Sequence, residues 1–346
     1  MDSQARVRAA LSLERPDRPP AAWWGHTYRE EWSPHDLASV TVARQREYGW
    51  DFVKLQPRAC SFAQAFGAEY RPSDDFRTAP VPVSPAVRDP ADWSRLPSAD
   101  ATAPPLRDQV EAVRTIVEEL GPSVPVIQTV FSPLTVAGYL LAEDKHRAAG
   151  QLREHPEAVG AALERVSVGL ADFAARSVEA GAAGIFYAIS GYASADLLSM
   201  EEYERLALPH DLRVLDGVPG GAWFNVLHLC GPRIHFELAS ALRSHALSWS
   251  VHEPGNPSLA EGRDRTGRAA MGGIDQARTL VEGTPEDVLK EVRAAISSTG
   301  GRGLLLAPGC SVPPGAPEEN LRALTRRSRR RPDSEHRAPR NRVRPP

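Results

Sequence analysis

Residues 284–310, TPEDVLKEVRAAISSTGGRGLLLAPGC, contain the clearest pattern of secondary structure in this sequence. Thr284 is typical of a helix N-cap, Pro285 of the first helical position, and Gly300 of the residue that follows a helix. The apolar run at 303–307 is typical of a buried strand. The stretch therefore predicts a helix followed directly by a strand, which is the repeating unit of an α/β fold.

The same alternation runs through most of the chain. Eight apolar runs predict strands, at residues 21–24, 51–55, 124–130, 184–189, 223–229, 246–251, 269–272 and 303–307. Strands that alternate with helices form right-handed parallel units, and eight such units can close into a (β/α)8, or TIM, barrel. We therefore expect a single α/β barrel domain over residues 1–325, with a Pro- and Asp-rich excursion at about 68–105.

The composition is that of a globular protein rather than of a membrane or disulfide-rich one. The 346 residues are 42% hydrophobic and 25% charged, which is ordinary for a globular chain. No apolar run is long enough for a transmembrane helix, and the N-terminus lacks the apolar segment of a secretory signal. Three cysteines in so long a chain argue against a disulfide framework, so we predict a cytoplasmic protein with free thiols.

Residues 326–346 differ from the rest of the chain. They contain nine arginines, several prolines and only two acidic residues, with too few apolar side chains to form a core. We predict a disordered Arg/Pro-rich tail. Contact with nucleic acid or acidic lipid is the alternative, but no aromatic residue is present to stack on a base. We therefore expect neither a nucleic-acid nor a membrane partner.

Polar residues that can catalyse reactions or bind metals follow the predicted strands. In a barrel, the carboxyl ends of the strands form the face that carries the chemistry. The residues found at or just after these ends include His26, Gln56, Ser132, Ser190, His228, Cys230, Glu253, Asp275 and Cys310.

His228 and Cys230 form the most specific pattern among them. Residues two apart in a strand face the same side, and Cys310 follows a strand that lies opposite in a small barrel. One imidazole and two thiolates suit Zn²⁺ with three protein ligands and an open fourth position. The alternative is a buried histidine bonded to backbone beside inert buried thiols. Cys60 is predicted to be a packing residue.

Several stretches resemble the uroporphyrinogen decarboxylase superfamily, which implies the (β/α)8 barrel. They are Arg15-Pro16-Asp17-Arg18-Pro19-Pro20, Phe131-Ser132-Pro133-Leu134-Thr135 with Tyr139, His228-Leu229-Cys230-Gly231, and Pro308-Gly309-Cys310 with Pro317-Glu318-Glu319-Asn320. Tyr139 matches a tyrosine that lines the decarboxylase pocket. The propionate-binding arginine of true decarboxylases is missing from residues 23–32, WWGHTYREEW, and their aspartate after the second strand is missing from KLQPRAC.

The His-x-Cys pattern with a distant cysteine is similar to that of zinc-dependent methylcobamide:thiol (coenzyme M) methyltransferases and cobalamin-independent methionine synthases. This resemblance implies one Zn²⁺ per chain, bound by His228, Cys230 and Cys310. Glu253, His26 or water would be the fourth ligand. The zinc would activate a small-molecule thiol for methyl transfer from a corrinoid or another methyl donor. The residues expected in the substrate pocket are Tyr139, Gln56, Ser132 and Asp275.

A corrinoid is expected only on a separate partner protein. Residues 144–150, DKHRAAG, nearly match the cobalt-ligating loop of corrinoid domains, but the glycine is one position late and the pattern is that of a surface helix. Two other functions stay open: a metal-free uroporphyrinogen decarboxylase, and a barrel that binds a ligand without catalysis.

Overall fold

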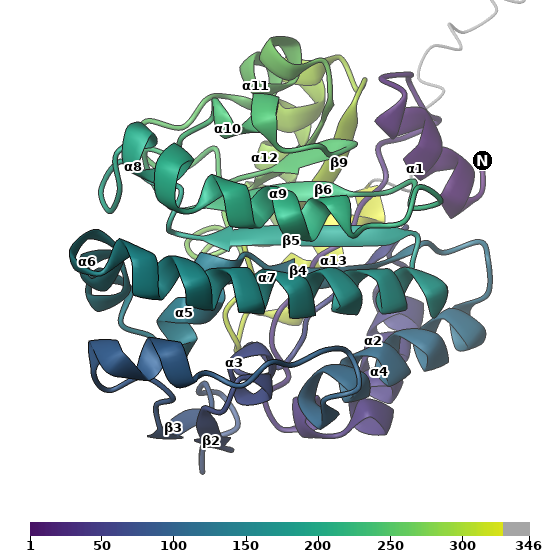
Figure 1. The fold of residues 1–346 in the computed structure, drawn as a ribbon. Helices are drawn as coiled ribbons and strands as arrows, with labels where there is room; N and C mark the ends of the chain where they lie inside the picture. Colours follow the sequence, from purple (N-terminus) through teal and green to yellow (C-terminus); the bar gives the residue numbers. More distant parts are fainter. Residues whose placement is uncertain (328–346) are drawn as a thin grey trace, which may run out of the picture.

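A computed structural model describes residues 1–327, with side chains to residue 325 (Figure 1). Its central element is a seven-stranded sheet in the order β1-β4-β5-β6-β7-β8-β9. All neighbouring strands in it are parallel. The strands are β1 Val53–Leu55, β4 Val126–Phe131, β5 Gly184–Ser190, β6 Val226–Cys230, β7 Ala246–Ser248, β8 Ala269–Ile274 and β9 Leu304–Pro308. An α/β fold with a parallel sheet is therefore confirmed.

Helices fill the connections between these strands, and α7 covers β4 and β5 (Figure 1). None of the helices within residues 1–327 is both long and apolar enough to cross a membrane. The α-helices are α1 Ser3–Leu11, α2 Pro34–Tyr48, α3 Ser61–Ala65, α4 Pro104–Leu120, α5 Pro133–Leu140, α6 Lys145–Glu154, α7 Pro156–Glu179, α8 Met200–Leu206, α9 Leu208–Asp216, α10 Leu238–Ala241, α11 Leu259–Thr266, α12 Pro285–Thr299 and α13 Glu318–Arg327. Two 3-10 helices are η1 Glu30–Trp32 and η2 Pro90–Arg95.

Helix α12 and strand β9 confirm the prediction made from residues 284–310. The Thr284 side chain accepts a hydrogen bond from the backbone of Asp287, whose carboxylate accepts one in return, so a complete capping box begins the helix. Gly300 ends it in the left-handed conformation, with φ 62°. The residues that predict the two ends of this helix therefore cap it as expected.

The predicted first strand at 21–24 is wrong in its extent. Only Ala21 forms a bridge, to Leu306 of β9. Pro20 lacks a backbone N–H, so the ladder cannot extend toward the N-terminus. The segment nevertheless forms hydrogen bonds on two sides: Leu306 N–H donates to Pro20 O, and Asp51 N–H donates to Ala21 O. Residues 20–22 thus connect β9 with the chain that leads into β1.

A buried ionic cluster fixes this segment. Both Asp51 oxygens are used: Arg6 Nη1 lies 2.7 Å from Oδ1, and Arg18 Nη1 lies 2.5 Å from Oδ2. Oδ2 also accepts the backbone N–H of Ala21 at 2.9 Å. Asp51 is 1% exposed, so the two guanidinium groups compensate for a charge removed from water. The Arg-Pro-Asp-Arg-Pro-Pro motif therefore stabilises the fold, because its residue Arg18 binds Asp51.

The excursion at 68–105 contains a small antiparallel pair, β2 Glu69–Arg71 and β3 Val81–Ser84, followed by η2. Trp93 in η2 is fully buried and its indole N–H donates to Gln151 of α6. The backbone oxygen of Trp93 accepts a hydrogen bond from Arg165 of α7 at 2.6 Å. The excursion thus packs on the helices that cover the sheet. The predicted disordered tail, apart from its first two residues in α13, lies outside the described residues.

Candidate metal centre

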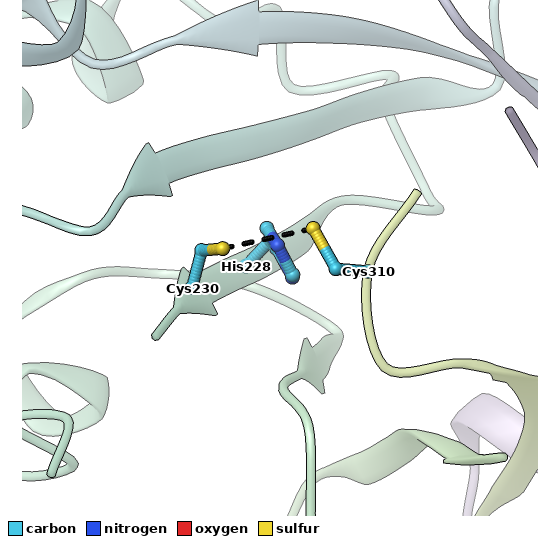
Figure 2. Close-up of side chains that lie close together, drawn as sticks. All are labelled: His228, Cys230 and Cys310. Atoms are coloured by element: carbon cyan, nitrogen blue, oxygen red, sulfur yellow. Dashed lines mark hydrogen bonds between the residues drawn. The ribbon is translucent and has the colours of Figure 1, made fainter. Parts of the chain in front are cut away.

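His228, Cys230 and Cys310 converge at the carboxyl end of the sheet. One possible ligand atom from each lies within 4.8 Å of the others. The sulfur atoms of Cys230 and Cys310 are 3.6 Å apart, and Figure 2 shows the two thiols directed toward one another beside the imidazole of His228. The structure therefore brings together the three residues that the sequence pattern singled out as metal ligands.

Strand alternation and two glycines produce this arrangement. His228 and Cys230 face one side of β6, while Leu229 between them is buried on the other. Gly231 follows with φ 106°, a conformation that favours glycine. Gly309 precedes Cys310, and a Cβ there would lie 2.7 Å from the Ser250 backbone. Both glycines let the chain turn where the ligands meet.

The orientation of His228 is set by its neighbour on β7. Its Nδ1 lies 3.1 Å from the backbone oxygen of Ser248 and 3.2 Å from the Ser248 hydroxyl. Because the carbonyl only accepts, Nδ1 carries a hydrogen, which leaves Nε2 as the ring nitrogen that could bind a metal. The ring also stacks on Phe186, with 5.0 Å between the ring centroids. His228 thus has the tautomer and the fixed ring that metal-binding histidines use.

The two thiols are electrostatically unequal. The hydrogen bond from Cys230, and then the imidazole of His228, hold the pKa of Cys310 well below its usual range. The same hydrogen bond, together with burial, raises the pKa of Cys230. Cys310 is therefore the more acidic thiol of the pair, and one proton lies between the two sulfur atoms. A cation would replace that proton and stabilise both thiolates.

These donors fit Zn²⁺. Thiolates and a neutral imidazole are ligands that zinc prefers, and calcium or magnesium would require oxygen. Two sulfurs, each about 2.3 Å from a tetrahedral zinc, lie about 3.8 Å apart, close to the 3.6 Å between Cys230 and Cys310. Three protein ligands would leave a fourth position for a substrate.

Of the two side chains predicted as possible fourth ligands, His26 is already engaged at both ring nitrogens. Nδ1 lies 2.9 Å from the Glu31 carboxylate and Nε2 lies 2.9 Å from the Gln56 amide. No lone pair of His26 is thus available in this conformation. Glu253, just after β7, is half-buried and its charge contributes to the raised pKa of Cys230. The identity of the fourth ligand therefore stays a prediction.

The four residues predicted to line the substrate pocket, Tyr139, Gln56, Ser132 and Asp275, have different surroundings. Tyr139 lines a cavity of about 180 Å³. Gln56 binds His26 and the Lys54 ammonium. Ser132 is the N-cap of α5 and is fully buried. Asp275 accepts hydrogen bonds from its own turn and from Arg278. Tyr139 is therefore the only one of the four that lines this cavity, and Ser132 and Asp275 hold local structure.

Sequence reasoning missed several polar groups near the centre. Lys54 is buried between aromatic rings, its Nζ 4.9 Å from the Phe186 ring, and burial lowers its pKa to about 7. A lysine inside a predicted strand was a usable signal for it. Glu143 and Lys145 line the same cavity as Tyr139, but their stretch has the pattern of a surface helix. Cys60 is buried at the start of α3, and burial raises its pKa to about 12, which agrees with a packing residue.

Comparison with known proteins identifies relatives over most of the chain. The family model described as uroporphyrinogen decarboxylase (URO-D) matches residues 3–331. A methylcobamide:CoM methyltransferase of Methanosarcina barkeri is 28% identical over 315 residues, which cover 90% of this chain and 88% of that protein. A uroporphyrinogen decarboxylase of Saccharopolyspora erythraea is 31% identical over 240 residues, covering 64% and 61%. The solved structure of a methyltransferase from Methanosarcina mazei has the same fold, with a TM-score of 0.77, 23% identity, and coverage of 95% and 98%.

Proposed function

Because the chain belongs to the uroporphyrinogen decarboxylase family, we propose that it is a zinc-dependent enzyme that activates a small thiol for methyl transfer. Its relatives include methylcobamide:CoM methyltransferases that match along nearly their whole length. The observation that carries the proposal is the convergence of His228, Cys230 and Cys310, with possible ligand atoms within 4.8 Å of one another. One Zn²⁺ per chain is the cofactor that this donor set suits.

We also propose that residues 20–22 occupy the position of the eighth strand, so that residues 1–325 form one TIM barrel domain. Hydrogen bonds from this segment to Leu306 and Asp51 support the closure. In such a barrel the three ligands stand at the mouth formed by the carboxyl ends of the strands, where catalytic sites of this fold are found.

The residues of this chain would hold the reacting sulfur in position through the metal that they bind. His228, oriented by Ser248 and packed on Phe186, keeps its Nε2 directed to one point. Cys230 and Cys310 supply the negative charge at that point. A zinc ion bound there would lower the pKa of a substrate thiol, so that it is held as the nucleophilic thiolate at neutral pH. The thiol proton would leave to solvent, and the sulfur would take the methyl group as the donor's bond to it breaks.

The methyl donor would be a methylated corrinoid on a separate protein, or another methyl compound. Residues 145–154 form α6, with Asp144 as its N-cap, which supports a helix rather than a cobalt-ligating loop. This part of the chain thus offers no corrinoid ligand of that kind, and the donor would dock at the barrel mouth.

Uroporphyrinogen decarboxylation is the second candidate, favoured by the relative from Saccharopolyspora erythraea and by Tyr139 at the cavity. The cavity of about 180 Å³ is smaller than the roughly 300–1,000 Å³ typical of sites for drug-sized ligands. A small thiol suits this volume better than a tetrapyrrole. Decarboxylation would also leave the three converging metal-type ligands without a use. A barrel that binds without catalysis is the third candidate.

The test combines metal content with turnover. The purified protein is analysed for zinc and then incubated with methylcobalamin and a small thiol, and the methylated thiol is measured. We expect about one zinc per chain and methylation that stops when a chelator removes the metal. A metal-free protein that decarboxylates uroporphyrinogen would establish the second candidate instead. Absence of turnover with either substrate would favour the binding protein.

A further inference from the structure

The cavity of about 180 Å³ that Tyr139 lines opens beside the predicted zinc ligands. Ser190, the last residue of β5, lines it and is the register partner of Cys230 on β6. The glycines that follow these two strands are also neighbours, because a Cβ on Gly231 would lie 3.8 Å from Gly191 Cα. A molecule with one end in this cavity can therefore reach the three converging ligands with its other end.

Lys145 and Glu143 carry opposite charges and both line the cavity; burial raises the pKa of Glu143, and the charges of His26 and Lys145 partly offset that effect. Lys145 and Glu143 form no side-chain hydrogen bond or ion pair with any residue in the described part of the chain. The Lys145 ammonium lies over the end of β5, since a Cβ on Gly191 would be 2.9 Å from Nζ. Gly191 in turn neighbours Gly231, the residue after Cys230, so the ammonium lies on the side of Cys230. The site thus offers a cation near the ligands and a separate anion.

The position of Glu143 is held by a turn that is unfavourable for its residue types. Ala142 and Glu143 both have left-handed backbones, with φ 60° and 72°. The Glu143 N–H donates to Gly138 O at 2.7 Å, which closes the turn after α5. Non-glycine residues adopt this conformation at a cost, and such strain gathers at ligand sites. The turn fixes the carboxylate at the cavity.

A buried hydroxyl in the cavity lacks a partner. Tyr192 is 1% exposed, lines the cavity, and its Oη forms no hydrogen bond with the described residues. A Cβ on Gly138 would lie 2.2 Å from Oη, so only glycine at 138 leaves room for it. Burial raises the pKa of Tyr192, which keeps the hydroxyl protonated and able to donate. A buried donor without a partner is costly and points to a ligand acceptor.

We propose that this cavity binds the thiol substrate as an amino-acid thiol, a small molecule that carries a carboxylate and an ammonium group besides its sulfur. Lys145 and the Tyr192 hydroxyl would bind the carboxylate, and Glu143 would bind the ammonium. A thiol that carries only an anionic group would leave Glu143 without a partner. A thiol that carries only an amine would leave Lys145 without a partner. The inference rests on the proposed function, because it assigns the acceptor of that reaction.

Binding of compounds that lack sulfur tests the cavity separately from catalysis. Isothermal titration of the zinc-loaded protein compares L-2-aminobutyrate with butyrate, which lacks the ammonium, and with propylamine, which lacks the carboxylate. We expect 2-aminobutyrate to bind about tenfold or more tightly than either, since each charge-assisted hydrogen bond contributes that much. Equal affinity for all three, or binding of none, would overturn the proposal.

Variants assign the two charges. Glu143→Gln should abolish the higher affinity for 2-aminobutyrate relative to butyrate. Lys145→Met should abolish the higher affinity for 2-aminobutyrate relative to propylamine. Tyr192→Phe should weaken 2-aminobutyrate and butyrate several-fold. His146→Ala is the matched control, because His146 is exposed next to Lys145 and does not line the cavity. Melting temperatures verify that each variant is folded. Unchanged selectivity in both charge variants would contradict the assignment.

The two proposals fail in different ways. If the protein binds 2-aminobutyrate selectively but methylates no thiol, the cavity assignment stands and the methyl-transfer function is refuted. If the protein methylates 2-mercaptoethanesulfonate as well as homocysteine and does not select 2-aminobutyrate, the methyl-transfer function stands. The proposal of an amino-acid thiol as the substrate is then refuted.

Discussion

The sulfur atoms of Cys230 and Cys310 lie 3.6 Å apart, although eighty residues separate the two cysteines in the sequence. One ends β6 and the other follows β9, with β7 and β8 between these strands in the sheet. The sheet must therefore curl before the sulfurs can meet. A metal bound at this point would stabilise the curled sheet, because the unfolded chain holds no such ligand set.

Removal of one sulfur should abolish tight metal binding. We expect Cys310→Ser to lower zinc affinity by more than about tenfold, because a hydroxyl stays protonated and is a poor ligand. Cys230→Ser and His228→Ala should act similarly, and Cys60→Ser should not, since Cys60 is buried at α3. Competition with a chromogenic chelator measures the affinity. Equal zinc retention in Cys310→Ser and Cys60→Ser would refute the metal centre.

Thiol reactivity should report on the same site. In metal-free protein we expect Cys310 to be alkylated first, because its pKa is lowered by Cys230 and His228. Zinc should protect both Cys230 and Cys310 from iodoacetamide. Cys60 should stay unmodified in either state, since burial covers the thiol and raises its pKa to about 12. Mass spectrometry of the alkylated peptides decides. Equal labelling with and without zinc would mean that the thiols do not bind it.

The sequence predicted elements whose signals are local. Helix α12 begins and ends at residues that cap helices by their own chemistry, β9 is a continuous apolar run, and β6 is apolar apart from His228. The pairing of His228 with Cys230 follows from strand alternation alone. Cys310 could be added because opposite strands of a small barrel converge at its mouth. That it binds zinc stays a prediction.

Other parts of the molecule depend on tertiary contacts that no local pattern contains. The predicted first strand forms only one bridge, from Ala21 to Leu306. Its backbone is held by that contact and by the ionic cluster around Asp51, which are distant in the sequence. Glu143 and Lys145 line a common cavity after a turn in which two non-glycine residues, Ala142 and Glu143, have left-handed backbones. The amphipathic pattern of α6 gives no sign of that turn, so the stretch resembles an ordinary surface helix.

The Asp51 cluster should dominate the stability of the N-terminal segment. Asp51→Asn removes the buried carboxylate that Arg6 and Arg18 share, and we expect a loss of about 3–5 kcal/mol in the free energy of unfolding. Asp17→Asn is the control, because Asp17 also pairs with Arg6 but its side chain is 45% exposed, and it should cost about 1 kcal/mol or less. Urea unfolding measures both. Equal losses would mean that burial does not distinguish the two carboxylates.

The ion pair of Arg153 and Glu202 should make stability depend on pH. Arg153 of α6 lies 2.6 Å from Glu202 of α8, and this hydrogen bond lowers the pKa of Glu202 to about 2. A carboxyl with a depressed pKa stabilises the fold above its unfolded value near 4.5 and loses that contribution as pH falls toward 2. Glu202→Gln should therefore cost about 0.5–1 kcal/mol at pH 7 and progressively less from pH 4.5 to 3. Glu201→Gln, at the neighbouring exposed position, is the control. A penalty that does not change with pH would contradict the ion pair.

The last prediction concerns how firmly His228 is oriented. Its Nδ1 contacts both the backbone oxygen and the hydroxyl of Ser248, at 3.1 and 3.2 Å. Loss of the partner that orients a metal-binding histidine typically weakens metal affinity about 10–100-fold. Ser248→Ala removes only the hydroxyl and leaves the carbonyl, so we expect less than about a tenfold loss, well below that of His228→Ala. Zinc competition on the two variants measures the difference. If Ser248→Ala weakens zinc as much as His228→Ala, the hydroxyl and not the carbonyl is the main acceptor that orients Nδ1–H, and the role assigned to the carbonyl would need revision.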